Sequence, residues 1–234
     1  MEGPSADTVS QPPTGENGGQ TAGRKLGFRA WTTAVWAVVF GCLYFFVRQY
    51  FKDGIWRFDL TLVNKSLGVA ALFLISLSMF LTGWSYFSRR AGKSLVLRKH
   101  FGLAGFWVGL SHGAIDHFLL PAMGLGPEKT PDSLHSEAAG LAALVIFAAM
   151  TLASNDRVRR LLGAGPWRLL LRFAGYAGLV LAAAHAALLK SASWSKYFRT
   201  FESVLPSLSL FVFAFAVVTV VLRLAVWCAR SRKK

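Results

Sequence analysis

Three ionisable side chains lie within an apolar stretch of the chain, GLAGFWVGLSHGAIDHFLLP, residues 102–121. They are His112, Asp116 and His117, and a fourth, His185, lies in the similarly apolar stretch GYAGLVLAAAHAALL. Ionisable groups at membrane depth are costly, and they usually face a protein interior, a cavity or a cofactor. Since imidazole can bind a metal or relay a proton, these four residues are the candidates for chemistry.

The composition indicates that these stretches cross a bilayer. Of the 234 residues 54% are hydrophobic and 16% are charged, which is too apolar for an ordinary soluble domain. A spanning helix needs about 20 apolar residues. Runs of roughly this length occur at 29–49, 66–88, 101–121, 138–154, 168–189 and 205–228. The runs are continuous, whereas barrel strands alternate apolar and polar residues, so we predict an all-α, six-transmembrane-helix bundle.

The distribution of Lys and Arg predicts the orientation, because short cationic loops stay in the cytoplasm. With the N-terminus inside, the basic clusters within 24–29, 89–99, 157–172 and 223–234 all lie on that side. The outer connection 122–137 holds one lysine and three acidic residues. We therefore expect both termini to be cytoplasmic. The expected location of the protein is the inner membrane of a bacterium. The net charge of +15 is then explained by span ends, and no nucleic-acid partner is expected.

The chain divides into a short tail and one membrane domain. Residues 1–23 are rich in Gly, Pro, Ser and Thr and lack an apolar stretch, which predicts a disordered tail. Residues 24–234 form the membrane domain, without a glycine-rich nucleotide loop or a CxxC pair for redox or metal chemistry.

Two of the histidines are expected at the same depth. His112 is 14 residues after Arg98, and His185 is 13 residues after Arg172, where both arginines mark the inner boundary of their spans. A helix rises about 1.5 Å per residue, so the two imidazoles should lie about 20 Å from that boundary. Both should therefore lie in the outer half of a hydrocarbon core about 30 Å thick.

The same spacing of small residues precedes each of these histidines. The residues are Gly102, Gly105 and Gly109 before His112, and Gly175, Gly178 and Ala182 before His185. Steps of three, four and three place each set on one helix face. Such stripes are usually sites of close helix packing, and 105–109 is itself a GxxxG motif. They can also leave room for a planar macrocycle between two helices.

A macrocycle held between two helices needs an axial ligand from each side and space beside the ligand. The paired patterns favour one b-type haem with His112 and His185 as its axial iron ligands. The residues that would bind beside the ring are Gly105, Gly109, Gly178 and Ala182. With both axial positions filled, the iron would have no place for O₂, which indicates electron transfer.

The other two candidate residues, Asp116 and His117, are expected on different sides of the helix. Asp116 lies four residues after His112, on the same side of the helix and nearer the outer surface, where it could bind an outer cation such as ferric iron or simply be solvated. His117 lies roughly 140° round the helix from His112 and should not share the haem face.

Three stretches, in this order and spacing, resemble the ferric reductase-like transmembrane domain family. They are RKHFGLAGFWVGLSH at 98–112, SND followed by RR, LG and W within 154–167, and the span leading to His185. The family includes the haem-binding membrane subunit of methionine sulfoxide reductase systems, NADPH oxidases and single-haem metalloreductases. The resemblance implies a six-helix bundle that passes electrons across the membrane through b-type haem.

Relatives with two haems carry a second histidine on each of these spans, nearer the cytoplasm. The corresponding positions here hold Arg98 and either Leu171 or Arg172, so the resemblance implies one haem. A cationic inner rim made of Arg98, Lys99, Arg168 and Arg172 could hold a flavin phosphate or a quinone head group. The same residues could instead act only as topology determinants.

We therefore predict a membrane oxidoreductase subunit that transfers electrons to an extracytoplasmic acceptor, which is ferric iron or a redox partner protein. The electron donor must be a quinol or a separate flavoreductase, since the chain has no nicotinamide or flavin domain of its own. A competing interpretation is a transport protein in which His112, Asp116, His117 and His185 form a proton or metal-ion path without haem. A third is an assembly subunit whose glycine stripes only pack helices.

Overall fold

The computed structural model describes residues 16–56, 58–88, 95–125, 131–201 and 205–232. All regular secondary structure in these ranges is helical, and no strand occurs in them. The elements are α1 (Glu16–Asp53), α2 (Leu60–Phe87), α3 (Leu95–Ala114), a π-helical turn η2 (Ile115–Leu119), α4 (Leu120–Ala122), α5 (Pro131–Ala153), α6 (Asp156–Leu162), α7 (Ala164–Thr200) and α8 (Leu208–Ser231). The predicted all-α fold is confirmed.

Five helices are long and apolar enough to cross a membrane. They are α1 from Phe28, α2, α5 from Ser133, α7 and α8. The chain is thus a multi-pass membrane protein. A sixth long helix, α3, overlaps the remaining predicted span 101–121, but its first two turns contain the polar residues Arg98, Lys99 and His100, which lower its mean hydropathy.

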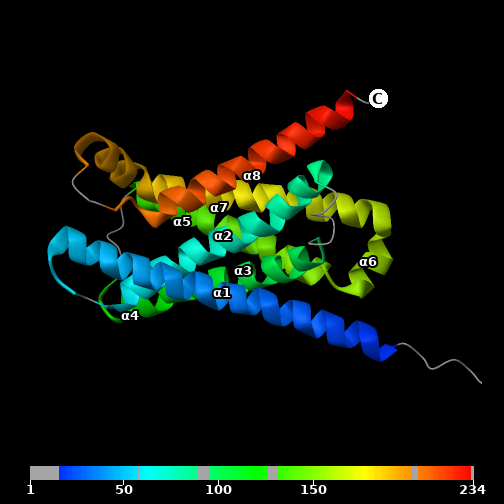
Figure 1. Cartoon of the computed structure of the whole chain (residues 1–234), viewed down its shortest axis with the longest axis horizontal. Coiled ribbons are helices and arrows are strands. Elements are labelled where there is room, and N and C mark those ends of the chain that lie inside the picture. Colours follow the sequence, from blue (N-terminus) through cyan, green and yellow to red (C-terminus); the bar gives the residue numbers. More distant parts are fainter. Residues whose placement is uncertain (1–15, 57, 89–94, 126–130, 202–204, 233–234) are drawn as a thin grey trace, which may run out of the picture.

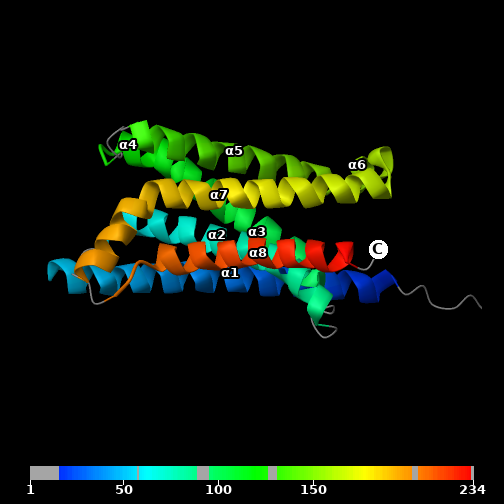
Figure 2. The ribbon, with the colours of Figure 1, turned by 90° about the horizontal axis from the view of Figure 1, so that it is seen from above.

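The helices form a bundle with α2 and α3 at its centre. Figure 2 shows α5 and α7 running side by side along one side of the bundle, α1 along the other, and α2 and α3 crossing between them. The described start of α1 and the end of α8 lie at the same end of the bundle (Figure 1). The opposite end, named the outer end after the orientation expected from the sequence, holds the first residues of α2 and α5 and the last residues of α3 (Figure 1).

Two apolar clusters hold the bundle together. The first joins α1, α2 and α3 and is built mainly from small side chains: Ala30, Ala34, Ala70, Ala71, Leu74, Phe101, Ala104 and Val108. The second joins α2, α3, α5, α7 and α8: Leu72, Ile75, Met79, Phe106, Ala143, Phe147, Leu179, Ala183, Val212 and Ala216. Because α2 and α3 contribute to both clusters, they are the helices on which the two halves of the bundle pack.

Large apolar side chains cover the outside of the bundle. On α1 they include Phe28, Trp31, Val35, Trp36, Phe40 and Leu43, all of them exposed. A continuous exposed apolar face of this kind would be unstable in water, but it is the surface that lipid covers. The exposed faces therefore agree with the assignment to a membrane.

Local signals explain several helix ends. The Asp59 side chain accepts a hydrogen bond of 2.8 Å from the Leu62 amide and caps α2. Gly163, with φ +75°, separates α6 from α7, since only glycine adopts this conformation without strain. Gly165 and Pro166 lie in the first turn of α7, where proline is tolerated because its amide needs no partner.

The N-terminal boundary differs from the sequence expectation. Helix α1 begins at Glu16, so residues 16–23 of the predicted disordered tail are helical. Extending a long helix adds one hydrogen bond for each residue fixed, whereas starting a new helix is costly, so a polar segment after the last proline can continue α1. Residues 1–15 of the predicted tail lie outside the described residues.

The end of α3 widens into the π-helical turn η2, which contains Asp116 and His117. Pro121 follows at once, in α4. Proline has no amide hydrogen, and its ring crowds the carbonyl four residues earlier, here that of His117. The wider turn accommodates this clash, and turns of this type are frequent at functional sites.

Close contact between α2 and α3 at Gly105 gives a testable expectation. A Cβ at this position would lie 2.8 Å from Ile75 Cγ1 and 3.1 Å from the Ile75 backbone nitrogen. Gly105→Ala should therefore lower the free energy of unfolding by about 1–3 kcal/mol, measured by denaturant unfolding in detergent. Gly109→Ala, on the same helix, is the control, because its added Cβ would lie at ordinary contact distance, 3.5 Å from Ala71 Cβ. Equal stability of the two variants would contradict the described α2–α3 packing.

Candidate functional site

The rings of His112, on α3, and His185, on α7, lie close together near the outer end of the bundle. Their ring centres are 6.4 Å apart and their planes are inclined by 65°. Both residues are half-buried. The prediction that these two imidazoles meet at one level is confirmed, while their role as metal ligands stays a prediction.

The His112 ring is held by Asn64 of α2. Its Nδ1 lies 2.8 Å from the Asn64 side-chain oxygen Oδ1 and 3.1 Å from the Asn64 backbone carbonyl oxygen. Both oxygens can only accept, so Nδ1 must carry the proton and donate it. The other ring nitrogen, Nε2, then carries the free lone pair that a metal requires.

The His185 ring is held in the same way by Ser136 of α5. Its Nδ1 lies 2.7 Å from the Ser136 carbonyl oxygen and 3.0 Å from the Ser136 hydroxyl oxygen. That hydroxyl donates its own proton to the His185 carbonyl oxygen at 3.1 Å. Nδ1 is therefore the donor here too, and Nε2 of His185 also carries a free lone pair.

Each ring also lies against a glycine one turn beyond its hydrogen-bond acceptor. A Cβ on Gly68 would lie 3.1 Å from both Cε1 and Nε2 of His112. A Cβ on Gly140 would lie 2.9 Å from Nδ1 of His185. Acceptor and glycine share one helix face because they are four residues apart. The absence of a side chain at these glycines lets each imidazole approach the neighbouring helix.

The site is thus built twice, once by each of two helix pairs. The two sets are Asn64, Gly68 and His112 in α2–α3, and Ser136, Gly140 and His185 in α5–α7. The acceptor precedes its histidine by 48 residues in the first set and by 49 in the second. Each pair therefore presents one imidazole, with the same nitrogen anchored, to the opposite pair.

This geometry fits two ligands on a single metal ion. A metal–imidazole bond is about 2 Å long, so two rings bound to one ion on opposite sides have centres about 6 Å apart. The observed 6.4 Å agrees with that value. Ligating histidines also commonly donate their second ring N–H to a carbonyl or amide oxygen, as both do here. The ring spacing and the Nδ1 hydrogen bonds are therefore compatible with two protein ligands on one iron, and a haem at this position stays a prediction.

A larger protein-only metal site is not found within the described ranges. No group of three or more His, Cys, Asp and Glu side chains is placed there to hold an ion. A haem needs fewer protein ligands, because its ring supplies four nitrogens and the protein only the axial ones.

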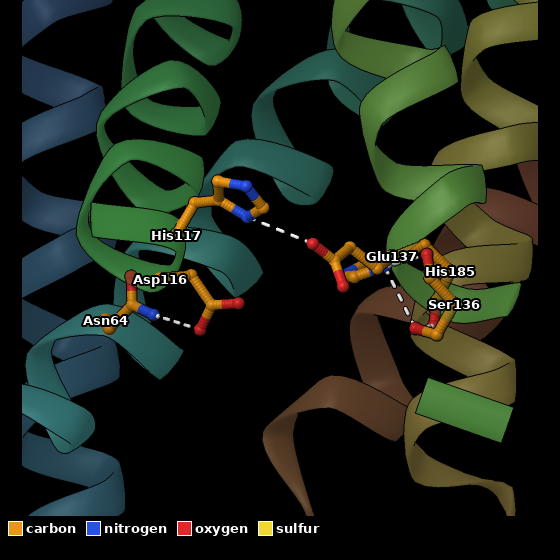
Figure 3. Close-up of polar contacts among 6 residues, drawn as sticks. All are labelled: Asn64, Asp116, His117, Ser136, Glu137 and His185. Atoms are coloured by element: carbon orange, nitrogen blue, oxygen red, sulfur yellow. Dashed lines mark hydrogen bonds and ion pairs between the residues drawn. The ribbon is translucent and has the colours of Figure 1, made fainter. Parts of the chain in front are cut away.

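Asp116 extends the hydrogen bonds of His112 toward the outer end. The Asn64 amide nitrogen donates to Asp116 Oδ1 at 3.0 Å, as Figure 3 shows. Because a carboxylate only accepts, this contact fixes the Asn64 amide with its nitrogen toward Asp116 and its oxygen toward His112. A negative charge is thus connected to His112 through one amide, on the side of the helix that the sequence predicts for Asp116.

His117 is directed to a different partner. Its Nδ1 lies 3.0 Å from Glu137 Oε1, a contact that joins the end of α3 to the start of α5 (Figure 3). The two side chains are 51% and 35% exposed, and ion pairs of that exposure contribute little stability. The structure therefore does not bring His117 to the pair formed by His112 and His185.

The small residues below the histidines lie at helix contacts. Gly105 lies against Ile75 of α2, and an added Cβ on Gly178 would lie 2.8 Å from the Phe147 ring of α5. Gly109 is in ordinary contact distance of Ala71, and Ala182 packs against the second apolar cluster. Helix packing accounts for these contacts, and a role beside a cofactor stays a prediction for all four residues.

The predicted inner rim is partly gathered by the fold. Arg98 is half-buried and Arg172 exposed, and the two lie in one group of interacting charges with Arg223 of α8. The Arg168 side chain instead donates to the carbonyl of Ala164 in its own helix at 3.0 Å. Of the arginines predicted for the inner rim, only Arg98 and Arg172 are thus brought together.

Four residues of the site were missed by sequence reasoning, namely Asn64, Gly68, Ser136 and Gly140. The predicted spans began at 66 and 138, which left both hydrogen-bond acceptors in loops. The signal that could have found them is the repeated spacing of a small polar residue, a glycine four positions later, and a histidine 48 or 49 positions after the polar residue.

Comparison with known proteins adds no assignment. No protein-family model matches this sequence. It also has no significant match among curated proteins. The functional interpretation therefore depends on the geometry around His112 and His185 and on the motifs within the chain.

Proposed function

We propose that this chain is a membrane b-type cytochrome subunit of the ferric reductase-like type, in which His112 and His185 are the axial ligands of one haem. The observation that carries the proposal is the pair of imidazoles with ring centres 6.4 Å apart, each with Nδ1 bound to an oxygen of a neighbouring helix. That arrangement leaves both Nε2 atoms available to iron, which a chance contact between two packing histidines would not require.

The proposal includes six spans, with α3 as the sixth, and cytoplasmic termini. Helix α3 packs against α1, α2 and α5, so much of its surface faces protein and needs less apolar character than a lipid-facing helix. The basic residues Arg98, Arg172 and Arg223 lie at one end, as expected for the cytoplasmic end. The basic residues within 89–94 lie outside the described residues. The bacterial inner membrane is the location that this orientation favours.

Each residue of the site has a defined task in this function. His112 and His185 would bind the iron, while Asn64 and Ser136 fix the ring orientation and the proton on Nδ1. A haem bound in this way supplies reversible one-electron oxidation and reduction. If both imidazoles bound the iron, they would leave no position on it for O₂ or a substrate, so the chemistry that the group would supply is electron transfer.

The position of the histidines suggests where electrons enter and leave. His112 is 14 residues from Arg98, or about 21 Å along α3, so an electron donor at the inner surface is far away. A quinol within the membrane, or a flavoreductase aided by a further carrier such as a flavin, would shorten that path. The outer end, which carries Asp116 and Glu137, lies closer to the two histidines than the inner surface does. Electrons would leave there, to ferric iron or to an extracytoplasmic redox partner.

The test is the visible spectrum of the protein purified from cells supplied with ample haem. We expect a Soret band that shifts on reduction and the sharp visible bands of a six-coordinate b-type haem. A folded but colourless preparation would exclude the cytochrome.

One observation favours the second candidate, a proton or metal-ion path. The chain Asp116–Asn64–His112 is hydrogen-bonded throughout, and the ion pair His117–Glu137 lies beside it (Figure 3). A colourless protein that binds zinc or conducts protons in vesicles, and loses this property with Asp116→Asn, would support that function instead.

Asp116 should also set the redox potential of the bound haem. Asp116→Asn removes a negative charge that is connected to His112 through Asn64, and negative charge favours the ferric state. We expect the midpoint potential to rise by roughly 30–60 mV, where about 59 mV corresponds to tenfold for one electron. Potentiometric titration measures the change. Asp53→Asn, which removes an exposed carboxylate paired with Lys52, is the control and should shift the potential far less.

A further inference from the structure

At the end of the bundle opposite the histidines, one buried polar atom has no partner. The hydroxyl oxygen of Tyr176, on α7, is inaccessible to solvent and makes no hydrogen bond within the described part of the chain. The Tyr176 ring packs against the second apolar cluster, which fixes where the hydroxyl lies. A buried hydroxyl without a partner is unfavourable, so a ligand that accepts its hydrogen bond would stabilise this arrangement.

Three arginines from three helices lie close enough to Tyr176 to act on it electrostatically. They are Arg98 of α3, Arg172 of α7 and Arg223 of α8. The guanidinium carbon Cζ of Arg223 lies 5.5 Å from the centre of the Tyr176 ring. The start of α3 is held in place there, since Ser78 Oγ of α2 donates to the Arg98 carbonyl oxygen at 2.8 Å. The backbone that carries Arg98 is therefore fixed against α2.

No negative charge compensates these arginines among the described side chains. The ion pairs formed between described side chains, Lys52–Asp53 and His117–Glu137, both lie at the outer end, away from these arginines. The three guanidinium groups also repel one another, since Arg98 interacts unfavourably with both Arg172 and Arg223. Arg98 and Arg223 are half-buried, and partly buried cations in membrane proteins are normally paired, so this cluster lacks the anion that would balance it.

The chemistry of the missing anion follows from the donors. Guanidinium groups bind phosphate oxygens through paired hydrogen bonds, and a phenol hydroxyl can add one more. We propose that Arg98, Arg172, Arg223 and Tyr176 form a binding site for a phosphate group between α3, α7 and α8. The phosphate comes from an anionic phospholipid of the adjacent leaflet or from free phosphate, and it neutralises the cluster and ties the three helices together.

This site is independent of the proposed haem. It lies about 21 Å along α3 from His112, counted as the 14 residues after Arg98, and shares no residue with the histidine pair. His185→Ala, which should remove the haem, is expected to leave phosphate binding unchanged. The two proposals can therefore fail separately.

The experiment uses the full chain, purified in detergent and stripped of lipid. Native mass spectrometry counts bound molecules after addition of phosphatidylglycerol, phosphatidylcholine or inorganic phosphate. We expect one phosphatidylglycerol to bind at least tenfold more tightly than phosphatidylcholine. If inorganic phosphate displaces the phosphatidylglycerol and binds as tightly on its own, the natural ligand of the site is free phosphate.

Two variants and one control locate the site. Arg223→Gln should weaken phosphatidylglycerol binding roughly tenfold, the effect of losing a charge-assisted hydrogen bond. Tyr176→Phe removes only the hydroxyl and should weaken binding roughly threefold to tenfold, so it remains informative if Arg223→Gln fails to fold. Arg230→Gln removes the same charge from the same helix; Arg230 acts on Arg223 electrostatically but lies over the Tyr86 ring at 5.2 Å, so its loss should weaken binding far less than Arg223→Gln does.

Two results would overturn the proposal. One is equal binding of phosphatidylglycerol and phosphatidylcholine with no binding of inorganic phosphate. The other is an equal loss of affinity in Arg223→Gln and Arg230→Gln, which would mean that the lipid responds to the total charge at this end and not to a defined site.

Discussion

Replacing either His112 or His185 by Ala should abolish the haem spectrum of the purified protein. Each substitution removes one of the two ring nitrogens proposed to bind iron, and the partner ring alone, 6.4 Å away across the pair, cannot hold the group in a fixed position. We expect bound haem to fall by at least tenfold, the size of effect that loss of even an indirect partner of a metal ligand can have. The measurement is the ratio of Soret to protein absorbance after purification.

The matched control for this prediction is His117→Ala. His117 is also an outer-end histidine of the same segment, but its partner is Glu137 and not the ring of His185. Its loss should leave the spectrum unchanged. If His117→Ala removes the haem and His185→Ala does not, the ligand assignment is wrong. His185→Met offers a further check, since a Met/His pair should restore six-coordinate iron with a higher potential.

Gly140→Ala should have the second largest effect, although it changes neither ligand. Its Cβ would lie 2.9 Å from His185 Nδ1, and a Cβ fixed to the backbone cannot turn away. The imidazole would have to move and break its hydrogen bond of 2.7 Å to the Ser136 carbonyl oxygen. Because such outer partners of a metal ligand typically control affinity by about 10–100-fold, we expect haem affinity to fall within that range.

Haem titration of the apoprotein measures this change. Gly68→Ala should act in the same direction on His112, somewhat less strongly, since its Cβ would lie 3.1 Å from the ring. Gly113→Ala is the control beside His112, because its Cβ would meet only the end of the flexible Leu144 side chain, at 3.0 Å. Wild-type affinity in both Gly140→Ala and Gly68→Ala would contradict the proposed anchoring of the two rings.

The helices and the meeting of the histidines could be predicted because they depend on few quantities. A long apolar run can satisfy its backbone in a bilayer only as a helix or a closed barrel, so run length nearly determines the element. The depth of His112 and His185 required only the rise per residue and a basic boundary on each span. Neither step needs knowledge of how the helices rotate about their axes.

The contacts around the rings depend on that rotation and could not be predicted. Whether Gly105 and Gly178 face each other or face neighbouring helices is decided by packing, and they face Ile75 and Phe147. Ser136 lies in the second turn of α5 because that helix begins at Pro131, before the apolar residues that set the predicted boundary at 138. A hydropathy pattern predicts the apolar part of a helix but not its polar first turns.

The number of haem groups per polypeptide tests the central claim most directly. It can be measured by extracting the haem into alkaline pyridine and dividing its amount by that of the protein from amino-acid analysis. With one pair of anchored imidazoles at the outer end and arginines at the opposite end, we expect a ratio near one. A ratio near zero in folded protein made with ample haem, or a ratio near two, would contradict it.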